Sequence, residues 1–218
     1  SRNQKEIANG YYNLGTIYGK IGDYPQAIVH LQTCIEMHEN TGDLYRMEGA
    51  YNNLAFVYWS QSDYDPAARY SRESLEISQR IGDTYGTAMC YNNLGGTHYV
   101  LNCFPRAIEY YERSLEIRME IGDLLGIANT YTNLGEVYHS LGNRQQALYY
   151  LLQAVELFVE IGNRTDLIDA YKLLAEVELE LNNVDKALEY RQHSLELAQE
   201  VEDQEFEGIA YRVLGQIH

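Results

Sequence analysis

The sequence predicts an all-α solenoid, and three observations indicate this fold class. Related phrases recur at a fixed period of 40 residues, and each opens with a tyrosine. Apolar residues within each phrase are spaced as on one face of a helix, and Gly-Asp or Gly-Asn pairs separate consecutive units. A fixed period on this scale indicates stacked copies of one supersecondary unit that bury a continuous core between neighbours. The tyrosines are Tyr11, Tyr51, Tyr91, Tyr131, Tyr171 and Tyr211.

The first helix of each unit, helix A, follows from the i, i+3, i+7 spacing of its large residues, as in Tyr51, Leu54 and Tyr58. The residue after the leucine is always Gly or Ala, which lets a neighbouring helix approach closely. We expect helix A to cover residues 44–60, 84–100, 124–140 and 165–181.

The second helix, helix B, begins after a turn whose residues favour a helix end. Gly22 and Asn102 suit the left-handed conformation that ends a helix, and Asp23 and Asp63 are typical N-caps. Helix B then carries one alanine at the same place in every unit, and a Gly-Asp or Gly-Asn pair closes the unit. The units are placed at about 4–43, 44–83, 84–123, 124–163 and 164–203, with a partial sixth at 204–218.

These columns resemble the tetratricopeptide repeat, with a large aromatic, Leu and Gly three and four residues later, then Tyr, and the Ala of helix B. The resemblance covers essentially the whole chain and implies a right-handed superhelical α-solenoid. With its 40-residue length and its Y-N-N-L-G and I-G-D phrases, the unit is similar to the extended repeats of spindle-orientation adaptors, kinesin light chains and bacterial signalling proteins. Such a resemblance does not by itself name a ligand.

Composition excludes some classes of partner. The 16 Lys and Arg against 32 Asp and Glu give a formal charge of −16, without the clustered cations that nucleic acids or anionic membranes require. Cys34, Cys90 and Cys103 are odd in number and lack a C-x-x-C spacing, which fits a reducing cytosol. From this cysteine usage we expect a cytoplasmic location. No signal peptide or membrane span is recognisable in the sequence.

A candidate binding position follows from the resemblance, because helix A lines the concave groove in this family. The family's peptide-contacting position lies two residues after the opening tyrosine. It is an asparagine in the first four repeats and becomes Leu173 in the fifth. An Asn amide matches the N–H and C=O of an extended peptide backbone. The alternative is that these amides bond to neighbouring helices and hold the superhelix in register. The ladder consists of Asn13, Asn53, Asn93 and Asn133.

Other expected groove residues are less uniform. Asn52 and Asn92 precede two of the ladder residues, and Phe56, Trp59 and Tyr99 form either an apolar wall for a partner side chain or simple packing between repeats. Acidic residues near the C-terminal end favour a basic ligand segment, unless they are only a solvated face. These acids are Glu136, Asp169, Glu176 and Glu180. The Lys and Arg clamp for a C-terminal carboxylate that chaperone adaptors of this family carry has no counterpart here.

No catalytic, metal-binding or nucleotide-binding motif is present in the sequence, and we expect no cofactor and no enzymatic activity. The leading hypothesis is a protein-interaction scaffold that binds an extended peptide or a partner helix. Since the chain starts and stops inside the repeat pattern, we expect it to be part of a larger bacterial signalling protein. The alternatives are end-to-end self-association through Tyr211, Val213 and Leu214, and a regulator that binds a signalling peptide, as Rap-type proteins do.

Overall fold

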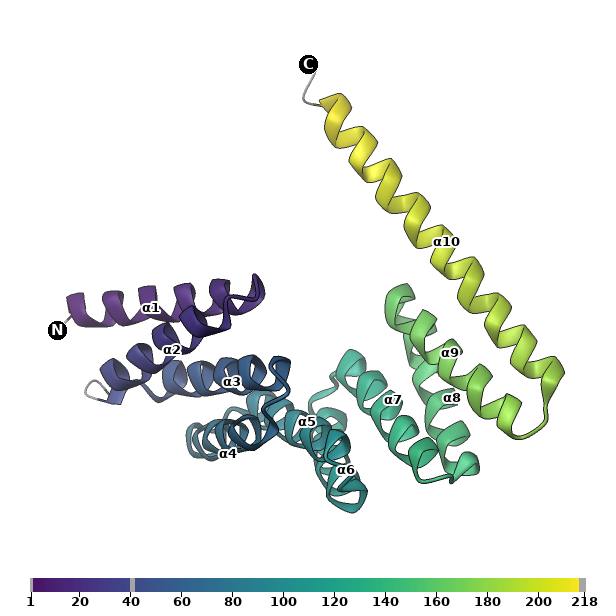
Figure 1. The fold of residues 1–218 in the computed structure, drawn as a ribbon, viewed down its shortest axis with the longest axis horizontal. Coiled ribbons are helices and arrows are strands. Elements are labelled where there is room, and N and C mark those ends of the chain that lie inside the picture. Colours follow the sequence, from purple (N-terminus) through teal and green to yellow (C-terminus); the bar gives the residue numbers. More distant parts are fainter. Residues whose placement is uncertain (1, 40–41, 216–218) are drawn as a thin grey trace. The chain divides into compact units, whose positions relative to one another are not determined.

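The computed structural model describes residues 2–39 and 42–215, which are helical apart from short turns and contain no strand (Figure 1). The expected all-α class is confirmed. None of the helices, as far as they are described, is long and apolar enough to cross a membrane. The helices are α1 (Arg2–Lys20), α2 (Tyr24–Glu39), α3 (Leu44–Ser60), α4 (Tyr64–Ile81), α5 (Thr84–Val100), α6 (Phe104–Ile121), α7 (Leu124–Ser140), α8 (Arg144–Ile161), α9 (Arg164–Glu180) and α10 (Val184–Gly215).

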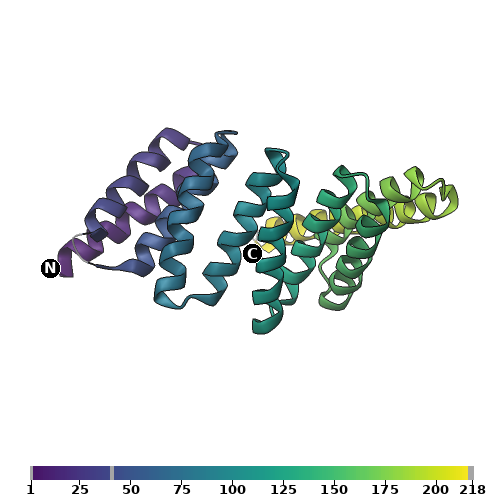
Figure 2. The same ribbon diagram turned by 90° about the horizontal axis from the view of Figure 1, so that it is seen from below.

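Consecutive helices form antiparallel hairpins, in which each odd-numbered helix A packs against the even-numbered helix B that follows it. The stack grows because helix B also packs against the next helix A, as α2 does on α3, α4 on α5 and α8 on α9. Figure 2 shows the hairpins of α1 to α6 side by side. The chain divides into two compact units, Ser1–Ile121 with α1 to α6 and Gly122–His218 with α7 to α10.

The turns between helices follow the predicted chemistry. Gly82 and Gly162 end α4 and α8 with φ of 73° and 69°, in the left-handed region. Asn102 adopts the same region with a φ of 56°. At the helix starts, Oδ1 of Asp83 accepts from the backbone N–H of Gly86 at 2.8 Å, which satisfies one of the orphan donors of α5.

The Gly or Ala that follows the helix A leucine is explained by close contact with helix B of the same hairpin. A Cβ added at Gly135 would lie 2.6 Å from Cγ of Leu151, and one at Gly95 would lie 2.7 Å from Cδ1 of Tyr111. Where this position holds Ala55 instead, the equivalent residue of helix B is the smaller Ser71. In these three hairpins a larger residue at one position is matched by a smaller residue at the other, whereas α9 and α10 pair Ala175 with the exposed Arg191.

Most of the periodic tyrosines have a structural role inside the hairpins. The ring of Tyr70 stacks on Tyr51 and Tyr58, with ring centroids 6.0 and 5.4 Å away. The same arrangement recurs in α5 and α6, where His98 replaces the second helix A tyrosine and stacks on Tyr110 at 5.3 Å. Burial lowers the pKa of His98, and the charges of nearby arginines lower it further. These rings fill the space between A and B helices rather than marking a ligand site.

The last helix departs from the expected pattern. The sequence places the start of a sixth unit at residue 204, but α10 continues without a break from Val184 to Gly215. Glu202 stands where the other units have a glycine with φ near 70°, and a residue with a side chain adopts that conformation only at a cost. The helix therefore continues. The side chains of Tyr211, Val213 and Leu214 lie outside the described residues.

Candidate interaction surface on the A helices

The ladder residues lie on successive A helices. In the first compact unit, Ser1–Ile121, Asn13 is exposed on α1, while Asn53 on α3 and Asn93 on α5 are half-buried. In the second compact unit, Gly122–His218, Asn133 on α7 is half-buried, and Leu173 occupies the same position on α9. The helical positions are as expected, and their contacts explain the partial burial.

Hydrogen bonds connect the ladder to neighbouring A helices. Nδ2 of Asn53 donates to Oγ1 of Thr16 at 2.9 Å, and Nδ2 of Asn93 donates to Oδ1 of Asn52 at 2.9 Å. These bonds tie α1 to α3 and α3 to α5. Within the described residues, Oδ1 of Asn53 and of Asn93 accepts no hydrogen bond. The amide groups of Asn53 and Asn93 therefore bond to neighbouring A helices through their nitrogen atoms.

Two of the three expected aromatic wall residues are accessible. Phe56 and Trp59 on α3 keep 54% and 45% of their surfaces exposed, which is high for such large apolar side chains. They stand on the same side of the helix as Asn52, because the three residues follow an i, i+4, i+7 spacing. Tyr99 on α5 is half-buried instead, and its ring packs against Phe104 with centroids 6.1 Å apart.

The acidic residues of the second unit are less free than their number indicates. Oδ1 of Asp169 accepts from Nζ of Lys172 at 2.9 Å. Burial raises the pKa of Glu136 above its ordinary value, and the charge of Asp169 raises it further, while His139 opposes both. Glu136 therefore binds a proton more readily than an ordinary exposed carboxyl does.

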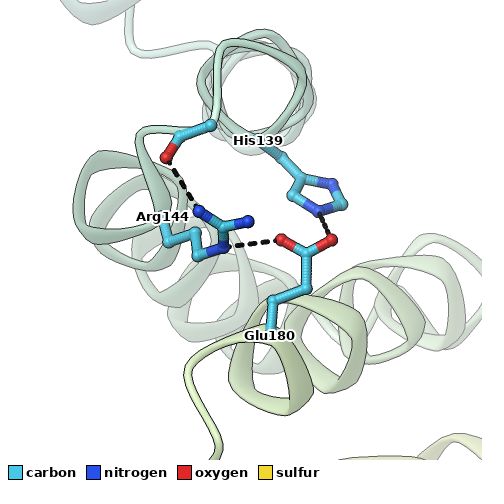
Figure 3. Close-up of polar contacts among 4 residues, drawn as sticks. His139, Arg144 and Glu180 are labelled. Atoms are coloured by element: carbon cyan, nitrogen blue, oxygen red, sulfur yellow. Dashed lines mark hydrogen bonds and ion pairs between the residues drawn. The ribbon is translucent and has the colours of Figure 1, made fainter.

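Glu180 is the best-connected of these acids (Figure 3). Its Oε1 lies 3.2 Å from Nε2 of His139, and its Oε2 accepts from Nε of Arg144 at 2.8 Å. Arg144 also donates from Nη1 to the carbonyl oxygen of Gly142 at 3.3 Å. The hydrogen bond from His139 and the contact with Arg144 lower the pKa of Glu180. This cluster joins α7, the start of α8 and the end of α9.

Sequence reasoning missed this ion-paired cluster because its members are far apart in the chain. Arg144 and Glu180 are 36 residues apart, and Arg164 pairs with Glu200 at the same separation, with an N···O distance of 3.0 Å. Oppositely charged residues 36 positions apart recur in the sequence, and a search for this spacing would have found both pairs.

A second feature that sequence reasoning missed is a buried polar seam among α3, α4 and α5. Oγ of Ser74 lies 2.9 Å from Oε1 of the buried Glu48 and accepts from the thiol of Cys90 at 3.2 Å. Burial raises the pKa of the Glu48 carboxyl, and burial raises the pKa of the Cys90 thiol to about 11. The thiol is therefore protonated at neutral pH and unsuited to nucleophilic chemistry.

Titratable side chains do not gather into a metal site in the described parts of the chain. No group of three or more His, Cys, Asp and Glu residues is placed to hold an ion there. What the A helices offer is a hydrogen-bonding row with exposed aromatic side chains in the first unit and a partly paired acidic patch in the second.

A family model for the tetratricopeptide repeat matches three overlapping stretches, residues 6–79, 46–118 and 91–158. The chain belongs to the tetratricopeptide-repeat family. Members of this family are in general non-catalytic scaffolds that bind protein or peptide partners, and no catalytic family is indicated. No curated protein matches the chain in sequence.

Solved structures share the repeat fold. BtubC (BKLC) from P. vanneervenii is 22% identical with a TM-score of 0.82, over 91% of this chain and 82% of that protein. The apo form of RapI is 22% identical with a TM-score of 0.84, over 92% and 73% of the two chains. A Rap protein complexed with Competence and Sporulation Factor is 23% identical with a TM-score of 0.75, over 89% of this chain and 54% of that one. At these identities the likeness shows the fold alone.

Proposed function

We propose that this tetratricopeptide-repeat chain binds an extended peptide or a partner helix along its A helices. The observation that carries the proposal is the exposed pair Phe56 and Trp59 on α3, in an array whose Asn53 and Asn93 amide oxygens accept no hydrogen bond within the described residues. Trp is a common energetic anchor of interfaces, and an Asn acceptor matches a peptide N–H. An apolar side chain of the ligand would contact the aromatic pair while its backbone follows the amides.

The second compact unit, by itself, supports a preference for a ligand with a basic segment. Glu136 and Glu176 lie one repeat apart on α7 and α9, and neither forms an ion pair within the described residues. A Lys or Arg of the ligand would be attracted to these carboxylates, and its binding would weaken with salt.

The test starts from peptides selected from a random display library on the immobilised chain, with affinity then measured by calorimetry. Trp59→Ala should cost about 2 kcal/mol or more if Trp59 is an interface anchor. Asn53→Ala should also weaken binding and leave the helical circular dichroism signal intact. Val29→Ala is the matched control, because Val29 is 55% exposed on the B helix α2. Unchanged affinity for both Trp59→Ala and Asn53→Ala would contradict the proposal.

The structural role of Asn53 can be separated from the proposed binding role. Thr16→Val removes the acceptor of the Asn53 amide and leaves Asn53 itself in place. We expect this variant to lose some stability and to keep peptide affinity. If Thr16→Val and Asn53→Ala weaken binding equally, Asn53 acts through helix register rather than through the ligand.

We further propose a cytoplasmic setting within a larger bacterial signalling or regulatory protein. The free cysteines support a reducing compartment. The likeness to RapI and to the Rap complex supports a second candidate, a regulator that binds a short signalling peptide. A selected consensus of a few residues with a free terminus would favour this candidate over a general scaffold.

A further inference from the structure

His98 on α5 is a buried titratable side chain without a hydrogen-bond partner. Only 6% of its surface is exposed, and neither Nδ1 nor Nε2 meets a donor or an acceptor within the described residues. Buried polar atoms in folded proteins are nearly always paired, because an unpaired one keeps its full desolvation cost. The imidazole is therefore held in place by packing.

The packing role of His98 is filled by tyrosine in neighbouring hairpins. Tyr58 on α3 stacks on Tyr70 with ring centroids 5.4 Å apart, and His98 stacks on Tyr110 at 5.3 Å. A phenol stays neutral below about pH 10, whereas an unperturbed imidazole takes up a proton near about pH 6.5. The exchange of Tyr for His thus adds a titratable group to a position whose packing does not need one.

The charges that shift the pKa of His98 are positive. Arg72 on α4 and Arg106 on α6 act on it from the two helices that pack most closely on α5. Burial lowers the pKa of His98 below its ordinary value of 6.5, and Arg106 and Arg72 lower it further. The ring on which it stacks, Tyr110, is a phenol. Within the described residues no carboxylate compensates a proton on His98, so the protonated ring is a buried cation without a partner.

We propose that His98 is an acid-sensitive switch of the α5–α6 hairpin, which is closed while the imidazole is neutral and opens when the ring takes up a proton. Opening separates the imidazole from Tyr110 and brings its nitrogen atoms to water. His98 lies in the last turn of α5, and its carbonyl oxygen accepts from the backbone N–H of Cys103 at 2.8 Å. A movement of His98 therefore disturbs the hydrogen bond that closes the turn between the two helices.

The direction of the pH dependence follows from the lowered pKa of His98 in the folded chain. Above pH 6.5 the imidazole is neutral in the folded and the unfolded chain, so its contribution to stability is fully present. As the pH falls below 6.5, the unfolded chain takes up a proton that the folded chain does not, and stability is lost until the pH reaches the folded pKa. One such proton raises the unfolding equilibrium constant by at most about tenfold per pH unit.

Urea denaturation of the full chain between about pH 8 and about pH 5 tests the switch. His98→Tyr supplies the residue found at Tyr58 and Tyr138, so it should fold, and it should lose less stability than the wild type as the pH falls. The other histidines are common to both chains, so the difference between them isolates His98. His30→Tyr makes the same exchange in the half-buried ring stack of α1 and α2 and is the matched control for the substitution itself. Equal losses for the wild type and His98→Tyr overturn the proposal.

Arg106→Gln separates the effect of charge from the effect of burial. Arg106 is exposed and Gln146 takes the equivalent position in α8, so this variant should fold. Removing the charge raises the folded pKa of His98 towards its ordinary value, and the variant should lose less stability than the wild type over the same pH range. A loss as large as that of the wild type overturns the role of Arg106.

Hydrogen exchange followed by mass spectrometry locates the opening. At about pH 5.5, below the ordinary pKa of an imidazole, α5 and α6 should exchange faster in the wild type than in His98→Tyr. The intrinsic exchange rate is the same for both chains at one pH, and α8 in the other compact unit is the internal reference. At about pH 8 the two chains should exchange alike. Equal exchange of α5 and α6 at the lower pH overturns the switch. Neither experiment uses a ligand, so the outcome is independent of the proposed peptide binding.

Discussion

Helices α4 and α8 occupy equivalent places in the repeat but bury different side chains. Where α8 buries Leu151 and Phe158, α4 buries Ser71 and Ser78. Both helices end at a glycine in the left-handed region, Gly82 and Gly162, so the repeat geometry is compatible with either set of buried side chains. In α8 the apolar area removed from water stabilises the contact, whereas α4 relies on hydrogen bonds that must all be made.

The polar seam of α4 becomes more costly when one of its members loses a hydrogen-bond partner. Ser74, Glu48 and Cys90 satisfy one another across three helices, and Oγ1 of Thr87 lies 3.1 Å from Oγ of Ser78. A buried donor or acceptor that loses its partner pays its full desolvation cost. Truncating a buried side chain should therefore lower the free energy of unfolding for different reasons in the two helices: lost apolar contacts in α8 and unpaired polar groups in α4.

The largest expected effect is in the apolar region. Phe158 is 1% exposed and packs among Ala154, Leu167 and Ala170. Phe158→Ala should lower the free energy of unfolding by about 3–5 kcal/mol, since the small neighbours cannot collapse into the cavity. Urea denaturation followed by circular dichroism measures this loss. Ser78→Ala is the equivalent change in α4, and a loss as large as that of Phe158→Ala would remove the contrast.

A smaller effect is expected when one member of the polar seam is removed. Ser74→Ala fits the backbone, because Ala154 occupies the same position in α8, but it removes the hydrogen bond to the buried Glu48. We expect a loss of about 1–3 kcal/mol in the same urea experiment. The double variant Glu48→Ala and Ser74→Ala should recover much of it, since Ala88 and Ala128 fill the Glu48 position elsewhere. A simple sum of the two single losses would show that the pair is not coupled.

The smallest expected effect is a pH dependence confined to the polar seam. Burial raises the pKa of Glu48 in the folded chain above the value of 4.5 for an exposed carboxyl, so the folded state holds its proton more tightly than the unfolded state. This contribution to stability is fully present below pH 4.5 and is lost as pH rises through the folded pKa. Glu48→Gln should therefore be more stable than the wild type at pH 7, with the difference shrinking towards pH 4.5.

Urea titrations of the wild type and Glu48→Gln at several pH values measure this difference. Glu76→Gln on the exposed side of α4 is the matched control for the substitution itself. A constant difference between wild type and Glu48→Gln across the pH range would show that folding does not shift the pKa of this carboxyl.

Much of the fold could be predicted from the sequence because its signals are local. The i, i+3, i+7 pattern, the left-handed glycines and the Asp caps each act within a few residues, and they repeat. The exception is α10. The sequence has Glu202 where the other repeats have the helix-ending glycine, but the 40-residue period favoured the start of a new repeat. At the candidate site, the helix positions of Asn53 and Trp59 were predictable, whereas the bond from Asn53 to Thr16 was not, because it joins residues 37 apart.

The sequence by itself determined the repeat, its helices and its turns, since backbone conformation is set by neighbours along the chain. Only the tertiary structure decided which side chains are shared between helices. It showed that the ladder amides already bond to adjacent A helices, that Glu180 is paired with Arg144, and that the ring nitrogens of His98 are buried without a hydrogen-bond partner within the described residues. Burial and charge pairing depend on side chains from other repeats that pack nearby, and a local sequence pattern does not show which side chains these are.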